Sequence, residues 1–253
     1  MREFTLENKS GETYRLNDTS HFFESPKGLG FKKNTQYKKI GDRFVIVSEE
    51  YEQPELSGKI DFRANTKEAA YQQYTAFCRF LDDTPLTMHY TAGAHHMIDV
   101  QADEIEKGEI EAVKGLSVEI KFKALTFFYD EYIESGTKSV TVESDSSIES
   151  GCHIEIKGRL VNPEWVQTVD GVEICKGKVI GTIQDGETLH IRTDMVPAWD
   201  IYKTDAAGNR TDMYDKSDFS TDRFVMIRKG INIISCAGAS AISVGGGISY
   251  ASV

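Results

Sequence analysis

Short segments in which apolar and polar residues alternate, separated by turn signals, run through most of this 253-residue chain. A period of two is the pattern of β-strands, because successive side chains point to opposite faces of a sheet. The first two segments, Phe4–Leu6 and Tyr14–Leu16, flank Asn8-Lys9-Ser10-Gly11 and are typical of a β-hairpin. The alternation therefore predicts a mainly β fold.

One segment has a different period and predicts the only helix that we expect. Between Lys67 and Asp82 the apolar residues recur at the spacing of one helix face. Asn65 or Thr66 can cap its first turn, and Pro85 lies just beyond its end. We expect the apolar face to pack on a sheet. That face consists of Ala70, Tyr74, Phe77, Cys78 and Leu81.

A second hairpin is predicted from Phe31–Ile40 and Phe44–Tyr51, which are separated by Gly41-Asp42. The first arm carries four lysines, and the second carries Glu49 and Glu50 and is followed directly by Glu52. Two interpretations remain open from the sequence. The pair forms either a long protruding hairpin or an ordinary surface hairpin whose charges are solvated.

The chain predicts two domains, 1–134 and 135–253. The first is a β-sheet domain with one α-helix, and its last expected strand is a long one over Leu116–Tyr129. The polar segment Asp130–Lys138 is interpreted as the junction between the two domains. The second shows no helical period and has turns at the intervals of an antiparallel β-sandwich. Its Gly245-Gly246-Gly247 is interpreted as a flexible edge or turn. Its expected strands are Val140–Val142, Cys152–Ile156, Val166–Val169, Val172–Ile183, Thr188–Ile191, Phe224–Ile227 and Ile231–Cys236.

The charge and the hydropathy exclude several classes of protein. A net charge of -11 argues against sequence-reading nucleic-acid binding, which needs a basic surface. No apolar run approaches the roughly 18 residues of a membrane span, so no membrane partner is expected. The opening Met1–Asn8 is too polar for a signal peptide. We therefore expect the chain to be made and kept in the cytoplasm unless it leaves within a larger particle.

The candidate catalytic and metal-binding residues do not form a recognisable site. His95-His96 with His89 and Asp99 have the right chemistry for a metal, but neighbours on a strand face opposite ways, so a turn with two histidines is preferred. The same argument separates Cys152 from His153, and no Gly-x-Ser-x-Gly elbow is present. We predict no catalytic, cofactor-binding or metal site, no cofactor and no enzymatic activity. The four cysteines are expected to be reduced and mostly buried.

Four aromatic residues in the second domain have two interpretations. Trp165, Trp199, Tyr202 and Tyr214 could line a carbohydrate platform, since sugar rings stack on aromatic faces. Packing in the core is the interpretation that we prefer.

The order of these elements resembles the distal tail protein (Dit) family of siphophages that infect Gram-positive bacteria. The resemblance extends over nearly the whole chain and depends on order and spacing rather than on one motif. The segments that carry the resemblance are Tyr14-Arg15-Leu16, Gly28-Leu29-Gly30, the helix from about Thr66 to Asp82, Phe127-Phe128-Tyr129, Gly158–Pro163, Gly186-Glu187, Leu189–Ile191, Asp194 and Lys229–Asn232.

The resemblance implies an N-terminal belt domain and a galectin-like C-terminal β-sandwich. It implies a structural protein of the virion tail tip that forms a homo-hexameric ring, or two such rings back to back. The ring would join the tail tube protein to the tail tip or adhesion apparatus, and DNA would pass through it without sequence-specific binding. His190-Ile191-Arg192 is only a fragment of a galectin sugar site, so lectin activity is not implied.

Two other functions remain as alternatives. A cell-wall carbohydrate-binding module of the tail tip is suggested by the sandwich and its aromatic residues. A wall-degrading enzyme is suggested only by the abundance of acidic residues, which makes paired carboxylates uninformative.

Overall fold

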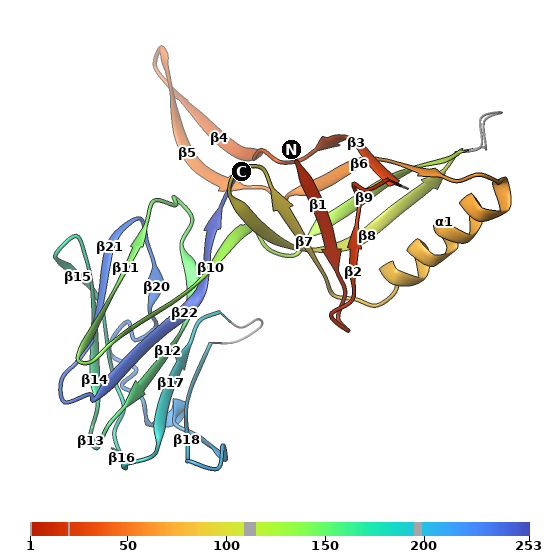
Figure 1. Cartoon of the computed structure of the whole chain (residues 1–253). Helices are drawn as coiled ribbons and strands as arrows, with labels where there is room; N and C mark the ends of the chain where they lie inside the picture. Colours follow the sequence, from red (N-terminus) through yellow and green to blue (C-terminus); the bar gives the residue numbers. More distant parts are fainter. Residues whose placement is uncertain (1, 20, 109–114, 195–198) are drawn as a thin grey trace. The chain divides into compact units, whose positions relative to one another are not determined.

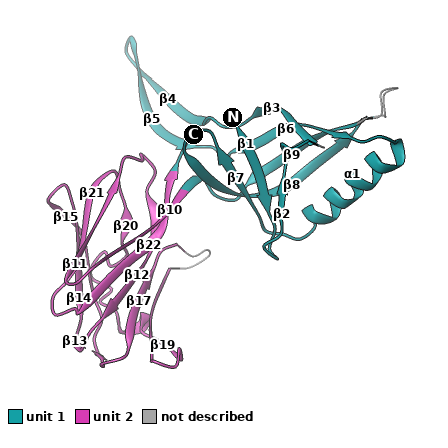
Figure 2. Ribbon diagram, in the orientation of Figure 1, with its two compact units in different colours: residues 1–129, 250–253 teal, residues 130–249 magenta. Residues whose placement is uncertain are grey.

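The computed structural model describes residues 2–19, 21–108, 115–194 and 199–253. It contains two compact units (Figure 2). Unit 1 comprises Met1–Tyr129 together with Tyr250–Val253, and unit 2 comprises Asp130–Ser249. Both units are built from antiparallel strands, and the described residues contain one α-helix, so the predicted mainly β class is confirmed. That helix is not long and apolar enough to cross a membrane, and neither is any other described segment in helical form.

Unit 1 is an antiparallel sheet in which the strand order is β2-β1-β7-β8-β9-β6-β3, with β4 and β5 paired apart from it. The predicted first hairpin is confirmed, since Leu6 pairs with Tyr14. The elements are β1 (Glu3–Glu7), β2 (Thr13–Arg15), β3 (His21–Lys27), β4 (Lys33–Ile40), β5 (Arg43–Tyr51), β6 (Glu55–Arg63), α1 (Lys67–Leu81), β7 (Leu86–Thr91), β8 (His95–Lys107), β9 (Gly115–Ala124) and the start of β10 (Phe128–Gly136).

The predicted helix is confirmed as α1, and it packs through its apolar face. Of the two predicted caps, Thr66 acts, because its hydroxyl accepts a hydrogen bond from the Ala69 amide at 3.1 Å. Phe77 is fully buried, and its ring lies 5.7 Å from that of Phe62 on β6. Figure 1 shows α1 beside the strands of unit 1. The helix therefore closes the core of this unit.

The prediction of one long strand over Leu116–Tyr129 is wrong, because the structure has two strands there. Strand β9 ends at Ala124, and β10 begins only at Phe128. The Leu125 amide donates to the Asp99 carbonyl at 2.7 Å, and the Thr126 hydroxyl accepts from the Asp99 amide at 3.0 Å. These hydrogen bonds fix the backbone between the two strands. The segment interpreted as a polar junction is mostly strand, and a boundary after Glu134 would fall inside β10, whereas the units divide after Tyr129.

The described residues of unit 2 form two larger antiparallel sheets, ordered β19-β18-β17-β12-β22-β10 and β11-β21-β14-β15, and a short antiparallel pair of β13 with β16. Their buried faces share one core, which makes this unit a β-sandwich. The elements are β11 (Ser139–Ser144), β12 (Ser150–Lys157), β13 (Leu160–Val161), β14 (Glu164–Val169), β15 (Val172–Lys178), β16 (Thr182–Ile183), β17 (Thr188–Arg192), β18 (Asp200–Thr204), β19 (Arg210–Asp212), the 3-10 turn η1 (Tyr214–Lys216), β20 (Met226–Ile227), β21 (Gly230–Cys236) and β22 (Ala241–Tyr250).

Two predictions for unit 2 are wrong in detail. Residues 172–183 form two strands rather than one, since Gly181 between them has a φ of 152°, which favours glycine. The glycine run is not a flexible edge or turn but the middle of β22, where Gly246 pairs with Cys152. A β-carbon on Gly246 would lie 2.9 Å from the Gly151 carbonyl oxygen. Close approach of the two backbones therefore explains the glycine.

Candidate assembly surface

Strands β4 and β5 form a two-stranded arm that pairs with none of the other described strands. The register runs from Lys33–Tyr51 to Ile40–Arg43, and Gly41 closes the turn with a φ of 63°. Figure 1 shows the arm extending away from the rest of unit 1. Of the two open interpretations, the protruding hairpin is confirmed.

The arm exposes apolar side chains on both of its faces. Four consecutive residues of β5 are exposed, at 70% for Phe44, 47% for Val45, 54% for Ile46 and 61% for Val47. Because neighbouring residues of a strand face opposite ways, neither face is covered. Tyr37 on β4 is exposed as well. An isolated hairpin is marginal in water, and an exposed apolar patch of this kind marks an interaction surface.

The charges at the base of the arm are paired with one another. Lys33 forms an ion pair with Glu49, and Lys32 lies 2.6 Å from Glu52. The hydrogen bond that the Lys32 ammonium donates to the Glu52 carboxylate raises the pKa of Lys32. The Lys33 ammonium also lies 4.6 Å from the centre of the Tyr51 ring. These contacts join the two strands at the end of the arm nearest the main sheet of unit 1.

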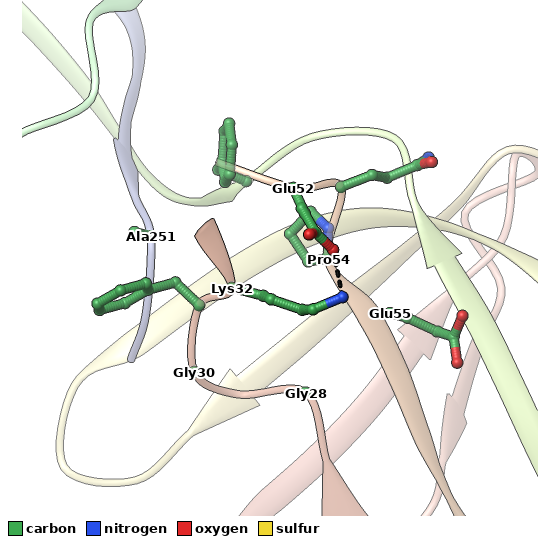
Figure 3. A pocket seen from close by; sticks show the side chains of 10 residues that line it. Gly28, Gly30, Lys32, Glu52, Pro54, Glu55 and Ala251 are labelled. Atoms are coloured by element: carbon green, nitrogen blue, oxygen red, sulfur yellow. Dashed lines mark ion pairs between the residues drawn. The ribbon is translucent and has the colours of Figure 1, made fainter. Parts of the chain in front are cut away.

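A pocket of about 490 Å³ lies beside this base. Figure 3 shows Lys32 reaching toward Glu52 within it. The Tyr51 ring links two of the neighbouring aromatics, with its centre 5.7 Å from Phe31 and 5.9 Å from Phe127. The pocket is lined by Gly28, Gly30, Phe31, Lys32, Glu52, Gln53, Pro54, Glu55, Phe127 and Ala251. The arm therefore stands on a partly aromatic, partly charged concave surface.

The predicted turn with two histidines is the start of β8 instead. The structure brings His89 and His95 together, with Nδ1 and Nε2 3.2 Å apart. The second ring nitrogen of His89 lies 3.2 Å from Glu7. Asp99 has other partners, since it accepts hydrogen bonds from the Thr87 and Tyr129 hydroxyls. The four residues considered for a metal are therefore not gathered around one point.

The four aromatic residues considered for sugar binding lie in different environments. Trp165 is fully buried, and its indole N–H donates to the Arg223 carbonyl at 2.9 Å, so core packing is confirmed for it. Trp199 is 47% exposed, and its ring and that of Tyr214 both pack against Phe224, whereas the other two aromatic residues lie elsewhere. Tyr202 stacks on His190. They do not form one platform.

Sequence reasoning missed one cluster, which consists of His153, Glu155 and His190 on the outer face of unit 2. Two of its members lie on β12 and the third on β17. His190 lies more than 30 positions after the other two in the sequence, and only the register of the two strands brings it beside them. The alternation along β12 shows that His153 and Glu155 share a face, but nothing in the sequence shows which strand lies beside them.

Comparisons with known proteins agree with the fold. Residues 3–125 match the family model described as distal tail protein, N-terminal domain. One similar solved structure is that of SPP1 Dit, a "paradigm of hub adsorption apparatus in Gram-positive infecting phages", at 13% identity and a TM-score of 0.73 over 96% of this chain and 98% of that one. A chain of the phage P2 baseplate in its activated conformation with Ca matches at 15% identity and a TM-score of 0.69 over 100% of both chains.

A second baseplate structure, determined with Sr, matches at 15% identity and a TM-score of 0.68, again over 100% of both chains. No curated protein matches the sequence. The structural matches establish the fold, and the family model covers nearly all of unit 1. The predicted resemblance is thus confirmed: residues 3–125 match the N-terminal domain of distal tail proteins, and the chain shares the fold of SPP1 Dit.

Proposed function

We propose that this protein is a structural, non-enzymatic subunit of a phage tail hub, in which six copies close a ring around a channel. The observation that carries the proposal is the apolar arm of β4 and β5, which extends from a distal tail protein domain with both faces uncovered. Pairing with a neighbouring copy would bury these side chains. Such a contact joins two different surfaces of the same chain. When the rotation from one copy to the next divides a full turn evenly, the copies close into a ring.

The hub would stand at the distal end of the tail, between the tail tube protein and the tail tip or adhesion apparatus. The likeness to chains of hub and baseplate structures supports this location in the virion. A second ring could pack back to back on the first. Unit 2, with its galectin-like sandwich, would then decorate the outside of the ring.

The net charge of -11 supports a channel through which DNA passes. An acidic wall repels phosphates, so the nucleic acid would slide during ejection instead of being held. No base-specific contact is needed for this role.

Light scattering on the purified protein tests the proposal. We expect a particle near six times the 28.3 kDa chain mass, or twice that for paired rings, when the protein is concentrated or bound to tail partners. Electron micrographs should show rings with a central opening. A monomer at every concentration, with no affinity for tube or tip proteins, would contradict the proposal.

A further inference from the structure

The outer face of one sheet of unit 2 gathers nitrogen and oxygen ligands from adjacent strands. His153 and Glu155 alternate along β12 with residues buried in the core, so both point to the outer face. Strand β17 lies between β12 and β18 (Figure 1). The ladder sets His190 directly opposite Glu155. The register therefore concentrates three ligating side chains on one patch.

These three side chains meet closely enough to hold one ion. His153 Nε2 lies 2.9 Å from His190 Nδ1, and that nitrogen lies 3.8 Å from Glu155 Oε1. One ligand atom from each residue lies within 4.8 Å of the other two. Two imidazoles and a carboxylate are the ligand set of many zinc sites that keep an open position.

Neighbouring residues fix the orientation of the His190 ring. The Thr204 hydroxyl on β18 lies 2.8 Å from His190 Nε2. When Nε2–H donates to this hydroxyl, the lone pair is left on Nδ1, which faces the cluster. The Tyr202 ring stacks on His190, with centres 4.6 Å apart and planes 11° apart. Such outer contacts are what orient histidines that bind metals.

The protonation state also suits a metal. Burial lowers the pKa of both His153 and His190 below the ordinary histidine value. Glu155 opposes this shift, and Arg192 reinforces it. A lowered pKa favours neutral imidazole, which is the form that coordinates an ion.

We propose that His153, Glu155 and His190 form a binding site for a divalent transition-metal ion such as Zn²⁺, with a further coordination position open to solvent. Nitrogens in a tetrahedral zinc site lie about 3.3 Å apart, given Zn–N distances of about 2.05 Å. Half-exposed His153 supplies the small rotation that this requires. Cys152 contributes nothing, because its side chain is buried on the opposite face.

Isothermal titration of the metal-stripped full-length protein with Zn²⁺ tests the proposal. We expect one ion per chain, with binding at least tenfold weaker in His153→Gln and His190→Gln and also weakened in Glu155→Gln. Thr204→Val should weaken binding about tenfold, because it removes only the hydroxyl that orients the His190 ring. Should His190→Gln fail to fold, His153→Gln and Glu155→Gln on the outer face still decide the matter. Bound Co²⁺ should show visible absorption without a thiolate charge-transfer band.

The chain offers a matched control in unit 1. His89 and His95 also stack with ring nitrogens in contact, and Glu7 lies beside them. The double variant His89→Gln/His95→Gln should bind Zn²⁺ as the unaltered protein does. The proposal is overturned if Zn²⁺ does not saturate a site, if binding survives in folded His153→Gln, or if it disappears in the control.

Discussion

Gly177 on β15 stands directly opposite Trp165 on β14, and the indole ring occupies the space in which a β-carbon on residue 177 would lie. That β-carbon would be 2.2 Å from Cε2 of the ring. The ring cannot move aside easily, because it is fully buried and its N–H donates to the Arg223 carbonyl at 2.9 Å. The glycine is therefore required by packing across the ladder.

Gly177→Ala should lower the free energy of unfolding of unit 2 by about 1–3 kcal/mol, the usual cost of an overpacked core. Urea unfolding followed by tryptophan fluorescence measures this, since both tryptophans, Trp165 and Trp199, lie in unit 2. Gly245→Ala is the control within another strand, where the added carbon would meet no atom nearer than 3.4 Å. Equal losses in the two variants would refute the steric explanation.

Val47→Glu should disrupt self-assembly, because it places a charge within the apolar face of the β4–β5 arm. Its matched control is Val172→Glu at the β14–β15 turn of unit 2, since Val47 is 61% exposed and Val172 is 64% exposed. We expect sedimentation to show smaller particles for Val47→Glu and unchanged ones for Val172→Glu. At dilutions where the unaltered protein is monomeric, both variants should keep its melting temperature, because neither side chain is buried within the chain. Identical particle sizes for the two would remove the arm from the interface.

Cys78 should be the thiol that reacts fastest in the folded protein. The other three cysteines are buried, and burial raises the pKa to about 12 for Cys152 and Cys175 and to about 11 for Cys236. At pH 8 these thiols stay protonated and therefore unreactive. A disulfide-exchange reagent should give one fast equivalent, which Cys78→Ala abolishes, and four in denaturant. Several fast equivalents in the native protein would contradict this.

The strands and the helix with regular periods could be predicted from the sequence, and the irregular parts could not. The helix α1 could be predicted because its two signals, the Thr66 cap and the apolar face that contains Phe77, lie in the helix segment or directly before it. The break after Ala124 depends on hydrogen bonds of Leu125 and Thr126 with Asp99, which lies 26 and 27 positions before them, and local alternation does not report such bonds. Gly245–Gly247 suggests an edge or turn because glycine weakens a strand, yet the run lies within β22, where close approach of the Gly151 backbone explains the glycine at position 246.

The candidate surfaces were also predictable only in part. The β4–β5 arm could be predicted as a hairpin, because Gly41-Asp42 separates two extended runs. Its exposure could not, since Phe44–Val47 reads equally well as a buried strand. The outer cluster of unit 2 needed the register of β12 against β17, which no single strand encodes.

Lys203→Met should make unit 2 less stable at neutral pH but not in acid. The Glu187 carboxylate accepts from the Gln184 amide and lies 2.8 Å from the Lys203 ammonium, and these two interactions lower the pKa of Glu187. A lowered carboxyl pKa stabilises the fold above the unfolded value of about 4.3, and the gain disappears as the pH falls through the folded value.

Urea unfolding at several pH values measures this effect. At pH 7 we expect Lys203→Met to unfold more easily than the unaltered protein by less than about 1 kcal/mol, since the pair is near the surface. The difference should shrink once the pH is below the folded pKa of Glu187. Lys203→Arg keeps the charge and should behave as the unaltered protein does. A loss of equal size at every pH would mean that Lys203 acts through its aliphatic stem, because packing does not titrate.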